Sequence, residues 1–258
     1  MIRTEIRDGA GWIWLARPEK KNAFDGAMLA AIADHVTAWS ANSDVRAIVL
    51  GADGETFCAG ADLNWMAAEA MAEGDGNRDS ARKLGRVFHT IAESKKPVIA
   101  RVQGAARGGG VGLVAACDIA ILSENASFAL TEVRLGLVPA VISPFVIERL
   151  GPSQARALFM TGDAIDAVQA HRLGLGHRLC AADQLDATVA QVLASLIKGG
   201  PEALVACKQL VARVAFADKR EVFEDTVDLI AQRRASAEAA EGMAAFLQRR
   251  TPNWIPKN

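Results

Sequence analysis

Two glycine-rich segments are the strongest candidates for binding negative charge in this 258-residue chain. One is Phe57-Cys58-Ala59-Gly60-Ala61-Asp62-Leu63, and the other is Gly108-Gly109-Gly110-Val111-Gly112. Each follows an apolar run of strand type and places small residues just before a helical pattern. Backbone N–H groups at a helix N-terminus are unpaired and can bind developing negative charge. Two such segments meeting at one oxygen would form an oxyanion hole, although the glycines could equally serve only tight turns and close packing.

Glu132 is the candidate general acid or base. It lies in Ala129-Leu130-Thr131-Glu132-Val133, between apolar residues and just after a predicted strand. Apolar surroundings disfavour the charged form of a carboxyl group and move its pKa toward neutrality, which suits general acid–base catalysis. The structural alternative is an acid at a helix start or a partner for Arg134.

Other kinds of site have weaker support. Gly110-x-Gly112-x-x-Ala115 fits the dinucleotide-binding fingerprint, but Asp118 follows far too soon to be the acid that binds the ribose. A phosphate-binding GxxxxGK[ST] loop does not occur in the sequence. The four histidines and four cysteines lack the HExxH and CxxC spacings of metal sites. We therefore expect neither a metal ion nor a separate cofactor.

The elements predicted around these residues alternate strands with helices. Apolar residues on both sides of Asp8-Gly9 predict a hairpin over residues 2–7 and 11–15. Helical spacing of apolar residues predicts an amphipathic helix over 26–41. Short continuous apolar runs predict buried strands, at residues 47–50, 97–102 and 119–122. This alternation favours an α/β layer architecture with mostly parallel strands.

From residue 152 onward the pattern is almost wholly helical. We expect a core over residues 1–195 and a C-terminal helical region over 196–258 that serves oligomerisation and covers the active site. Residues 185–250 carry more apolar helix faces than one core of this size readily absorbs, which favours packing on another subunit.

Composition excludes several classes of protein. Hydrophobic residues make up 51% of the chain and the formal net charge is −1, which is typical of a globular domain and not of a basic nucleic-acid binder. The most apolar stretch, residues 111–122, is too short to span a bilayer and contains Asp118. Scattered cysteines and the lack of a secretory h-region predict a cytoplasmic protein. The balanced charge and the short apolar stretch predict that it has neither nucleic-acid nor membrane partners.

Several segments in order resemble the crotonase (enoyl-CoA hydratase/isomerase) superfamily over nearly the whole chain. They are Arg17–Phe24, Phe57–Leu63, Lys96–Ala100, Gly108–Gly110, Cys117–Ala120, Glu241–Leu247 and Pro252-Asn253-Trp254. The resemblance implies a spiral of ββα units with a C-terminal helical region, assembled as trimers or dimers of trimers. It also implies an acyl-CoA thioester as substrate, with coenzyme A as part of that substrate.

The same resemblance assigns roles to individual residues. The amides of Ala61 and Gly109 would form the oxyanion hole, with Glu132 as the catalytic acid. The residues implied to bind coenzyme A and the rest of the substrate are Lys21, Ala59, Asp62, Leu63 and Gly108. Gly112 and Trp65 are predicted to belong to the acyl pocket.

Gly112 marks a departure from the family pattern, because hydratases with two catalytic acids have a glutamate there. Segments 62–66, 110–116 and 132–144 are similar to the methylglutaconyl-CoA hydratase branch, which acts in leucine or acyclic isoprenoid breakdown. The first hypothesis is therefore hydration of a 2-enoyl-CoA, with 3-methylglutaconyl-CoA or a related branched acyl-CoA as substrate. The alternatives are a Δ3–Δ2-enoyl-CoA isomerase and a non-catalytic acyl-CoA-binding homologue. Arg82, Lys83, Arg86 and Arg134 are candidate partners for a distal carboxylate, or solvated surface charges.

Overall fold

A six-stranded sheet forms the centre of the computed structural model, which describes residues 1–71 and 74–255. The strand order is β1-β2-β3-β4-β6-β9, and only β1 runs antiparallel to its neighbour. The strands are Ile2–Arg7, Ala10–Leu15, Ala47–Ala52, Val98–Val102, Ile119–Ser123 and Arg178–Cys180. The predicted hairpin is confirmed, since Asp8 and Gly9 both have positive φ, as a tight turn between twisted strands requires.

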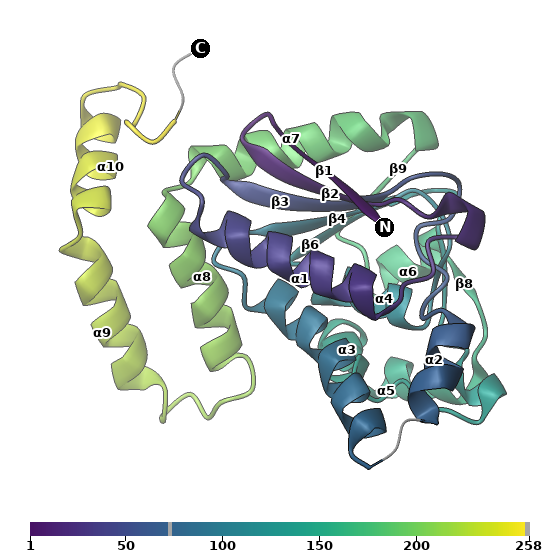
Figure 1. Ribbon diagram of the computed structural model, residues 1–258. Helices are drawn as coiled ribbons and strands as arrows, with labels where there is room; N and C mark the ends of the chain where they lie inside the picture. Colours follow the sequence, from purple (N-terminus) through teal and green to yellow (C-terminus); the bar gives the residue numbers. More distant parts are fainter. Residues whose placement is uncertain (72–73, 256–258) are drawn as a thin grey trace.

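Helices cover both faces of this sheet, which explains the continuous apolar runs of its parallel strands. Ala47 and Val49 of β3 pack in one cluster with α7, Leu185–Lys198, while Ile48 and Leu50 point to the opposite cluster. That opposite cluster contains buried residues of α1 (Gly26–Ala41), α3 (Gly76–Ala92) and α4 (Gly109–Ala116). Figure 1 shows α7 above the sheet and α1 and α3 below it. The α/β class with a mostly parallel sheet is confirmed.

A second, smaller sheet leads into the segments that contain Gly108 and Glu132. Its order is β5-β7-β8, with bounds Ala106–Arg107, Ser127–Ala129 and Ile165–Asp166. The remaining helices before the C-terminal region are α2 (Leu63–Ala70), α5 (Ser143–Thr161, kinked at Gly151) and α6 (Ala167–Arg172). Short 3-10 turns lie at Pro18–Lys20, Glu132–Leu135 and Ala182–Gln184.

The prediction of an almost wholly helical chain from residue 152 onward misses two strands, because β8 and β9 fall within that stretch. They contain two and three residues, and each exists only because a strand from an earlier part of the chain pairs with it. Runs this short leave no periodic signal in the sequence. The predicted boundary at residue 195 falls inside α7, which continues along the sheet to Lys198.

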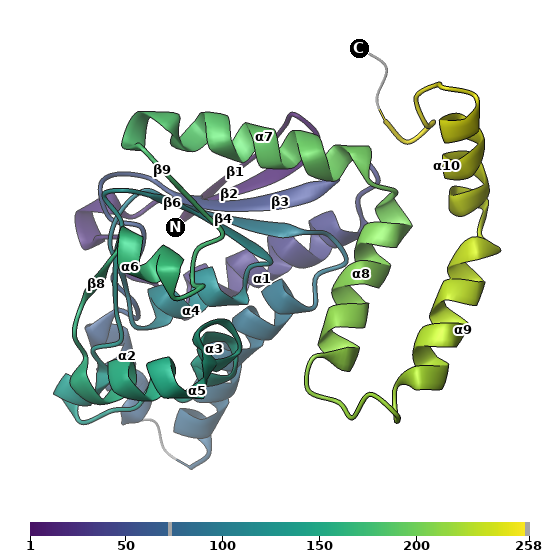
Figure 2. The ribbon, with the colours of Figure 1, turned by 180° about the vertical axis from the view of Figure 1, so that it is seen from behind.

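The C-terminal arm consists of α8 (Pro201–Val214), α9 (Phe223–Arg234) and α10 (Ala237–Leu247), with the segment that follows to residue 255. Figure 2 shows α9 and α10 set apart from the sheet. Polar contacts tie the arm to the core. The Lys208 ammonium on α8 lies 2.8 Å from the Asp118 carboxylate, and the Arg46 guanidinium donates to the carbonyls of Trp254 and Gly199 at 2.7 and 2.8 Å.

No single helix in the described ranges is both long and apolar enough to cross a membrane. The bent pair of residues 182–198 and 201–214, which turns through 103°, passes only by length and composition. In α7, however, the apolar residues Leu185, Val189 and Leu193 are buried against the sheet.

Candidate active site

The segment Gly60-Ala61 is held in place by the loop that contains Phe24. The Phe24 amide donates to the Gly60 carbonyl at 2.9 Å, and the Asp62 amide donates to the Phe24 carbonyl at 2.8 Å. Gly60 has φ +94°, and a side chain there would meet the Arg107 carbonyl at 2.9 Å. Glycine is therefore required at position 60 by both its backbone conformation and the close approach of a neighbouring strand.

The second glycine segment begins α4. Gly108 has φ +49°, and its carbonyl accepts from the amides of Val111 and Gly112, which starts the helix. Strand β5, just before it, pairs with the first glycine segment through the amide of Arg107, which donates to the Cys58 carbonyl at 2.9 Å. As a result the two segments touch: a Cβ built on Gly60 would lie 3.7 Å from the Gly109 nitrogen.

The amides of Ala61 and Gly109 form no hydrogen bond to any other residue in the described part of the chain. Gly109 is the first residue of α4, where an N–H has no partner within the helix. The β-bridge between Phe24 and Ala61 uses the carbonyl of Gly60 and the amide of Asp62. The N–H of Ala61 therefore has no partner in the described part of the chain. Two unpaired donors on adjoining segments are what an oxyanion hole needs.

Glu132 lies beside these donors. The Gly108 amide donates to the Ala129 carbonyl at 2.9 Å, which aligns the end of β7 with the start of α4. Glu132 follows three residues later, and its Oε1 is 3.0 Å from the position that a Cβ on Gly108 would occupy. Its Oε2 is buried and has no hydrogen-bond partner among the described residues. Desolvation by burial raises the pKa of Glu132, opposed in part by a hydrogen bond from its own backbone amide.

A cavity of about 270 Å³ opens over these groups. Six of the residues predicted for the site line it together: Ala59, Ala61, Leu63, Gly108, Gly109 and Glu132. The rest of the lining is almost entirely apolar and comes mainly from α2, α3 and the residues that follow Glu132. Its members are Phe24, Gly60, Met66, Ala81, Leu84, Thr131, Leu135, Leu137, Val138, Pro139, Ala140, Val141 and Ile142.

Lys21 and Asp62 lie next to this lining but are not part of it. The Lys21 carbonyl accepts from the Ala59 amide at 2.9 Å, and the exposed Lys21 side chain is available to an anion such as a phosphate. The Asp62 carboxylate caps α2 by accepting from the amides of Asn64 and Trp65. Desolvation opposes it, but these hydrogen bonds and the nearby Arg17 hold the pKa of Asp62 below its usual value.

Gly112 and Trp65, the two residues predicted for the acyl pocket, lie behind the described cavity surface instead of on it. The space beside Gly112 is filled by Ile142, whose Cγ2 would be 2.3 Å from a Cβ at Gly112. The Trp65 indole packs against Gly26, and its Nε1 donates to the Glu69 carboxylate at 3.0 Å. Neither residue lines the cavity of this structure, so their assignment to the acyl pocket stays a prediction.

Phe24 and Ile142 are among the lining residues that sequence reasoning did not assign to the site. Phe24 fills the space next to Gly109, where a Cβ would approach its ring to 2.4 Å. Its place directly after Asn22-Ala23, in a segment already singled out, was the available signal. Ile142 lies ten residues after Glu132 in an irregular loop without a periodic pattern, and its available signal was its place in the resembling segment 132–144.

Comparison with known proteins decides the family. The family model described as enoyl-CoA hydratase/isomerase matches residues 5–257. The chain belongs to this family. The crotonase resemblance and the expected fold are confirmed, and the chain is an enzyme of the crotonase superfamily.

Similar proteins cover this chain almost end to end. A crotonyl-CoA hydratase of Syntrophomonas wolfei is 32% identical, over 95% of this chain and 94% of its own length. A 2,3-dehydroadipyl-CoA hydratase of Escherichia coli is 31% identical, over 93% and 92%. The crystal structure of an enoyl-CoA hydratase/isomerase from Legionella pneumophila has a TM-score of 0.91 at 41% identity and covers 98% of both chains.

Proposed function

We propose that this enzyme adds water across the double bond of a 2-enoyl-CoA thioester. The observation that carries the proposal is the meeting, at one cavity, of two unpaired amides (Ala61 and Gly109) with the half-buried carboxyl of Glu132. The names of two relatives, the crotonyl-CoA hydratase and the 2,3-dehydroadipyl-CoA hydratase, support hydration as the reaction.

The geometry suits a mechanism with one acid–base group. The thioester oxygen accepts hydrogen bonds from the amides of Ala61 and Gly109, so that negative charge can move onto it as the enolate forms. The Glu132 carboxylate removes a proton from water while the water oxygen bonds to C3. The same carboxyl group then returns a proton to C2, which restores the thioester and the carboxylate. Water and proton arrive on the same face of the double bond, as addition by a single group requires.

The same three groups also suit an isomerase, in which Glu132 would move a proton from C2 of a 3-enoyl-CoA to C4. The experiment that separates the reactions follows the 2-enoyl thioester absorbance at about 260–280 nm. Loss of absorbance with crotonyl-CoA supports hydration, and a gain with a 3-enoyl-CoA supports isomerisation. If neither absorbance changes while acyl-CoA still binds, the protein is a non-catalytic binder.

The acyl group is proposed to be uncharged. Among the residues described, only Thr131 and Glu132 contribute polar side chains to the cavity, and no cation lines it. Arg134 lies 57% exposed and pairs with Asp163 at 3.0 Å, and Arg82 pairs with Asp79 on the outer face of α3. A carboxylate at the end of the acyl chain, as in a methylglutaconyl group, would be buried without a partner.

Saturated analogues test this proposal without turnover. Isovaleryl-CoA and 3-methylglutaryl-CoA share a branched skeleton and differ by a terminal carboxylate. We expect isovaleryl-CoA to inhibit or bind at least about tenfold more tightly, because leaving a charge unpaired costs more than 1.4 kcal/mol. Tighter binding of 3-methylglutaryl-CoA would contradict an uncharged acyl group and support the methylglutaconyl substrate.

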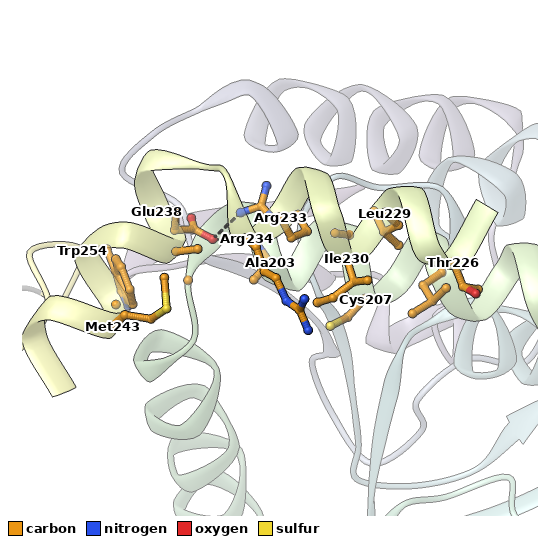
Figure 3. A pocket seen from close by; sticks show the side chains of 15 residues that line it. Ala203, Cys207, Thr226, Leu229, Ile230, Arg233, Arg234, Glu238, Met243 and Trp254 are labelled. Atoms are coloured by element: carbon orange, nitrogen blue, oxygen red, sulfur yellow. Dashed lines mark hydrogen bonds and ion pairs between the residues drawn. The ribbon is translucent and has the colours of Figure 1, made fainter. Parts of the chain in front are cut away.

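The arm is proposed to pack against a second copy of this chain in a trimer or a dimer of trimers. Figure 3 shows the cavity of about 530 Å³ between α8, α9 and α10, lined by Ala203, Cys207, Leu229, Ile230, Met243 and Trp254 among others. Beyond it, Phe216, Phe246 and Leu247 are 84%, 84% and 80% exposed. Apolar surface on this scale is typical of a subunit interface.

Light scattering after size-exclusion chromatography is expected to give three or six times the 27.3 kDa chain mass. Phe246→Asp should lower that mass by placing a charge within the apolar interface. Val168→Asp is the matched control, since Val168 is 62% exposed but lies on α6, outside the arm. A monomeric wild-type protein at micromolar concentration would refute the assembly.

A further inference from the structure

Two glycines occupy helix interiors beside the cavity, Gly85 in α3 and Gly112 in α4. Glycine inside a helix costs about 1 kcal/mol relative to alanine, so it usually has a packing reason. A β-branched side chain from the loop before α5 lies over each of them. A Cβ at Gly85 would be 3.7 Å from Val141, an ordinary contact, whereas a Cβ at Gly112 would be 2.3 Å from Cγ2 and 2.8 Å from Cβ of Ile142. Ile142 therefore occupies the volume that a side chain at position 112 would need.

Ile142 separates the cavity from the backbone of α4. Its side chain is 2% exposed and lines the cavity together with Val141. On its other side lies Gly112, and the Phe88 ring lies 3.1 Å from the Cβ position there. Gly112 follows Gly109, the residue with the unpaired amide, by three positions, which is about 4.5 Å along a helix axis. Ile142 thus forms the wall close to the place where the acyl chain leaves the thioester carbon.

We propose that Ile142 is a specificity-determining residue, which closes the acyl pocket over Gly112 and restricts the enzyme to short acyl groups. This inference rests on the proposed binding of an acyl-CoA in this cavity. One side chain, packed against a glycine, then sets the length of the acyl chain that the pocket accepts. Ile142→Ala removes three carbons from the wall and opens the pocket toward Gly112 and Phe88.

Binding of saturated acyl-CoA thioesters measures the pocket without turnover. Each buried methylene is worth about a fourfold gain in affinity. By isothermal titration calorimetry, we expect Ile142→Ala to raise the ratio of the butyryl-CoA dissociation constant to the octanoyl-CoA dissociation constant at least tenfold, because the larger pocket favours the longer chain. Ile142→Val should shift it less, and free coenzyme A should bind unchanged. The same shift should appear in kcat/KM for the corresponding 2-enoyl thioesters.

The reciprocal substitution tests the contact itself. Gly112→Ala should press Ile142 into the cavity and weaken hexanoyl-CoA and octanoyl-CoA more than butyryl-CoA. In the double variant Gly112→Ala/Ile142→Ala, the chain-length ratio should return to within about threefold of wild type, because contacting residues are not additive. Recovery of folding in the double variant, if Gly112→Ala alone is unstable, supports the same contact. Gly85→Ala is the matched control and should leave the ratio unchanged.

The failure of this inference is distinguishable from failure of the proposed function. If wild-type protein binds no acyl-CoA more tightly than free coenzyme A, the acyl cavity itself is refuted. If acyl-CoA binds but Ile142→Ala leaves the chain-length ratio within twofold, only the role of Ile142 is overturned.

Discussion

Replacing Glu132 with glutamine is expected to lower kcat for hydration by about 10²–10⁴-fold, the usual contribution of a general acid–base group. Glutamine keeps the size of the side chain but cannot accept a proton from water. The fold and the affinity for acyl-CoA should persist, since Oε2 forms no hydrogen bond within the described residues that the change would break. Steady-state kinetics with a 2-enoyl-CoA, and circular dichroism for the fold, provide the measurement.

Glu69→Gln makes the same chemical change on a partly buried glutamate outside the cavity lining. This control should stay within about twofold of the wild-type rate, because among the described residues Glu69 accepts a hydrogen bond only from the Trp65 indole. A Glu132→Gln enzyme that retains more than a third of the wild-type rate would remove Glu132 from the mechanism.

The pH dependence follows from the raised pKa of Glu132. Hydration needs the carboxylate, so kcat/KM should fall as the pH drops through a pKa above the usual glutamate value, and Glu132→Gln should lack this limb.

The same raised pKa of Glu132 has the opposite effect on stability, which should fall as the pH rises. A raised native pKa means that the protonated group favours the folded state below its unfolded pKa, and this contribution is lost as the pH rises through the native pKa. Glu132→Gln should therefore unfold at a higher temperature than wild type at neutral pH.

Replacing Gly108 with alanine is expected to lower kcat by about 10²-fold or more, because one change disturbs both parts of the site. Gly108 has φ +49°, a conformation that costs other residues about 1–3 kcal/mol. Relief of that strain would turn the adjoining Gly109 amide away from the substrate oxygen, and loss of one such donor costs about 10²–10³ in kcat. The new methyl group would also lie 3.0 Å from Oε1 of Glu132 and displace it.

Gly151→Ala separates strain from catalysis. Gly151 has φ +72° and nothing within 4 Å of the added Cβ, and it lies at the kink of α5 outside the cavity lining. Thermal unfolding should show a loss of stability similar to that of Gly108→Ala, while kcat should remain within about twofold of wild type. Equal kinetic effects of the two substitutions would mean that Gly108 acts only through stability.

The sequence by itself determined the parts of this protein whose signals are local. Gly60-Ala61 and Gly108-Gly109 each follow an apolar strand and precede a helix, so their unpaired amides could be expected from chain order alone. Glu132 was identifiable because a carboxyl group among apolar residues is expected to have a raised pKa, which suits a general acid or base. The parallel strands of the first 150 residues were predictable as continuous apolar runs, because helices cover both faces of the sheet. The helices α1 and α3 were predictable from apolar residues at helical spacing, because one face of each packs on the core.

Only the tertiary structure decided what surrounds these groups. Gly112 appeared to leave room for substrate, yet Ile142, thirty residues later, fills that room, and no periodic pattern connects the two positions. Trp65 donates to Glu69 and packs against Gly26, the first residue of α1, a contact that the sequence of α2 does not predict. Strands β8 and β9 exist only through their partners. Local patterns encode backbone conformation, whereas the shape of a cavity depends on which distant side chains meet across it.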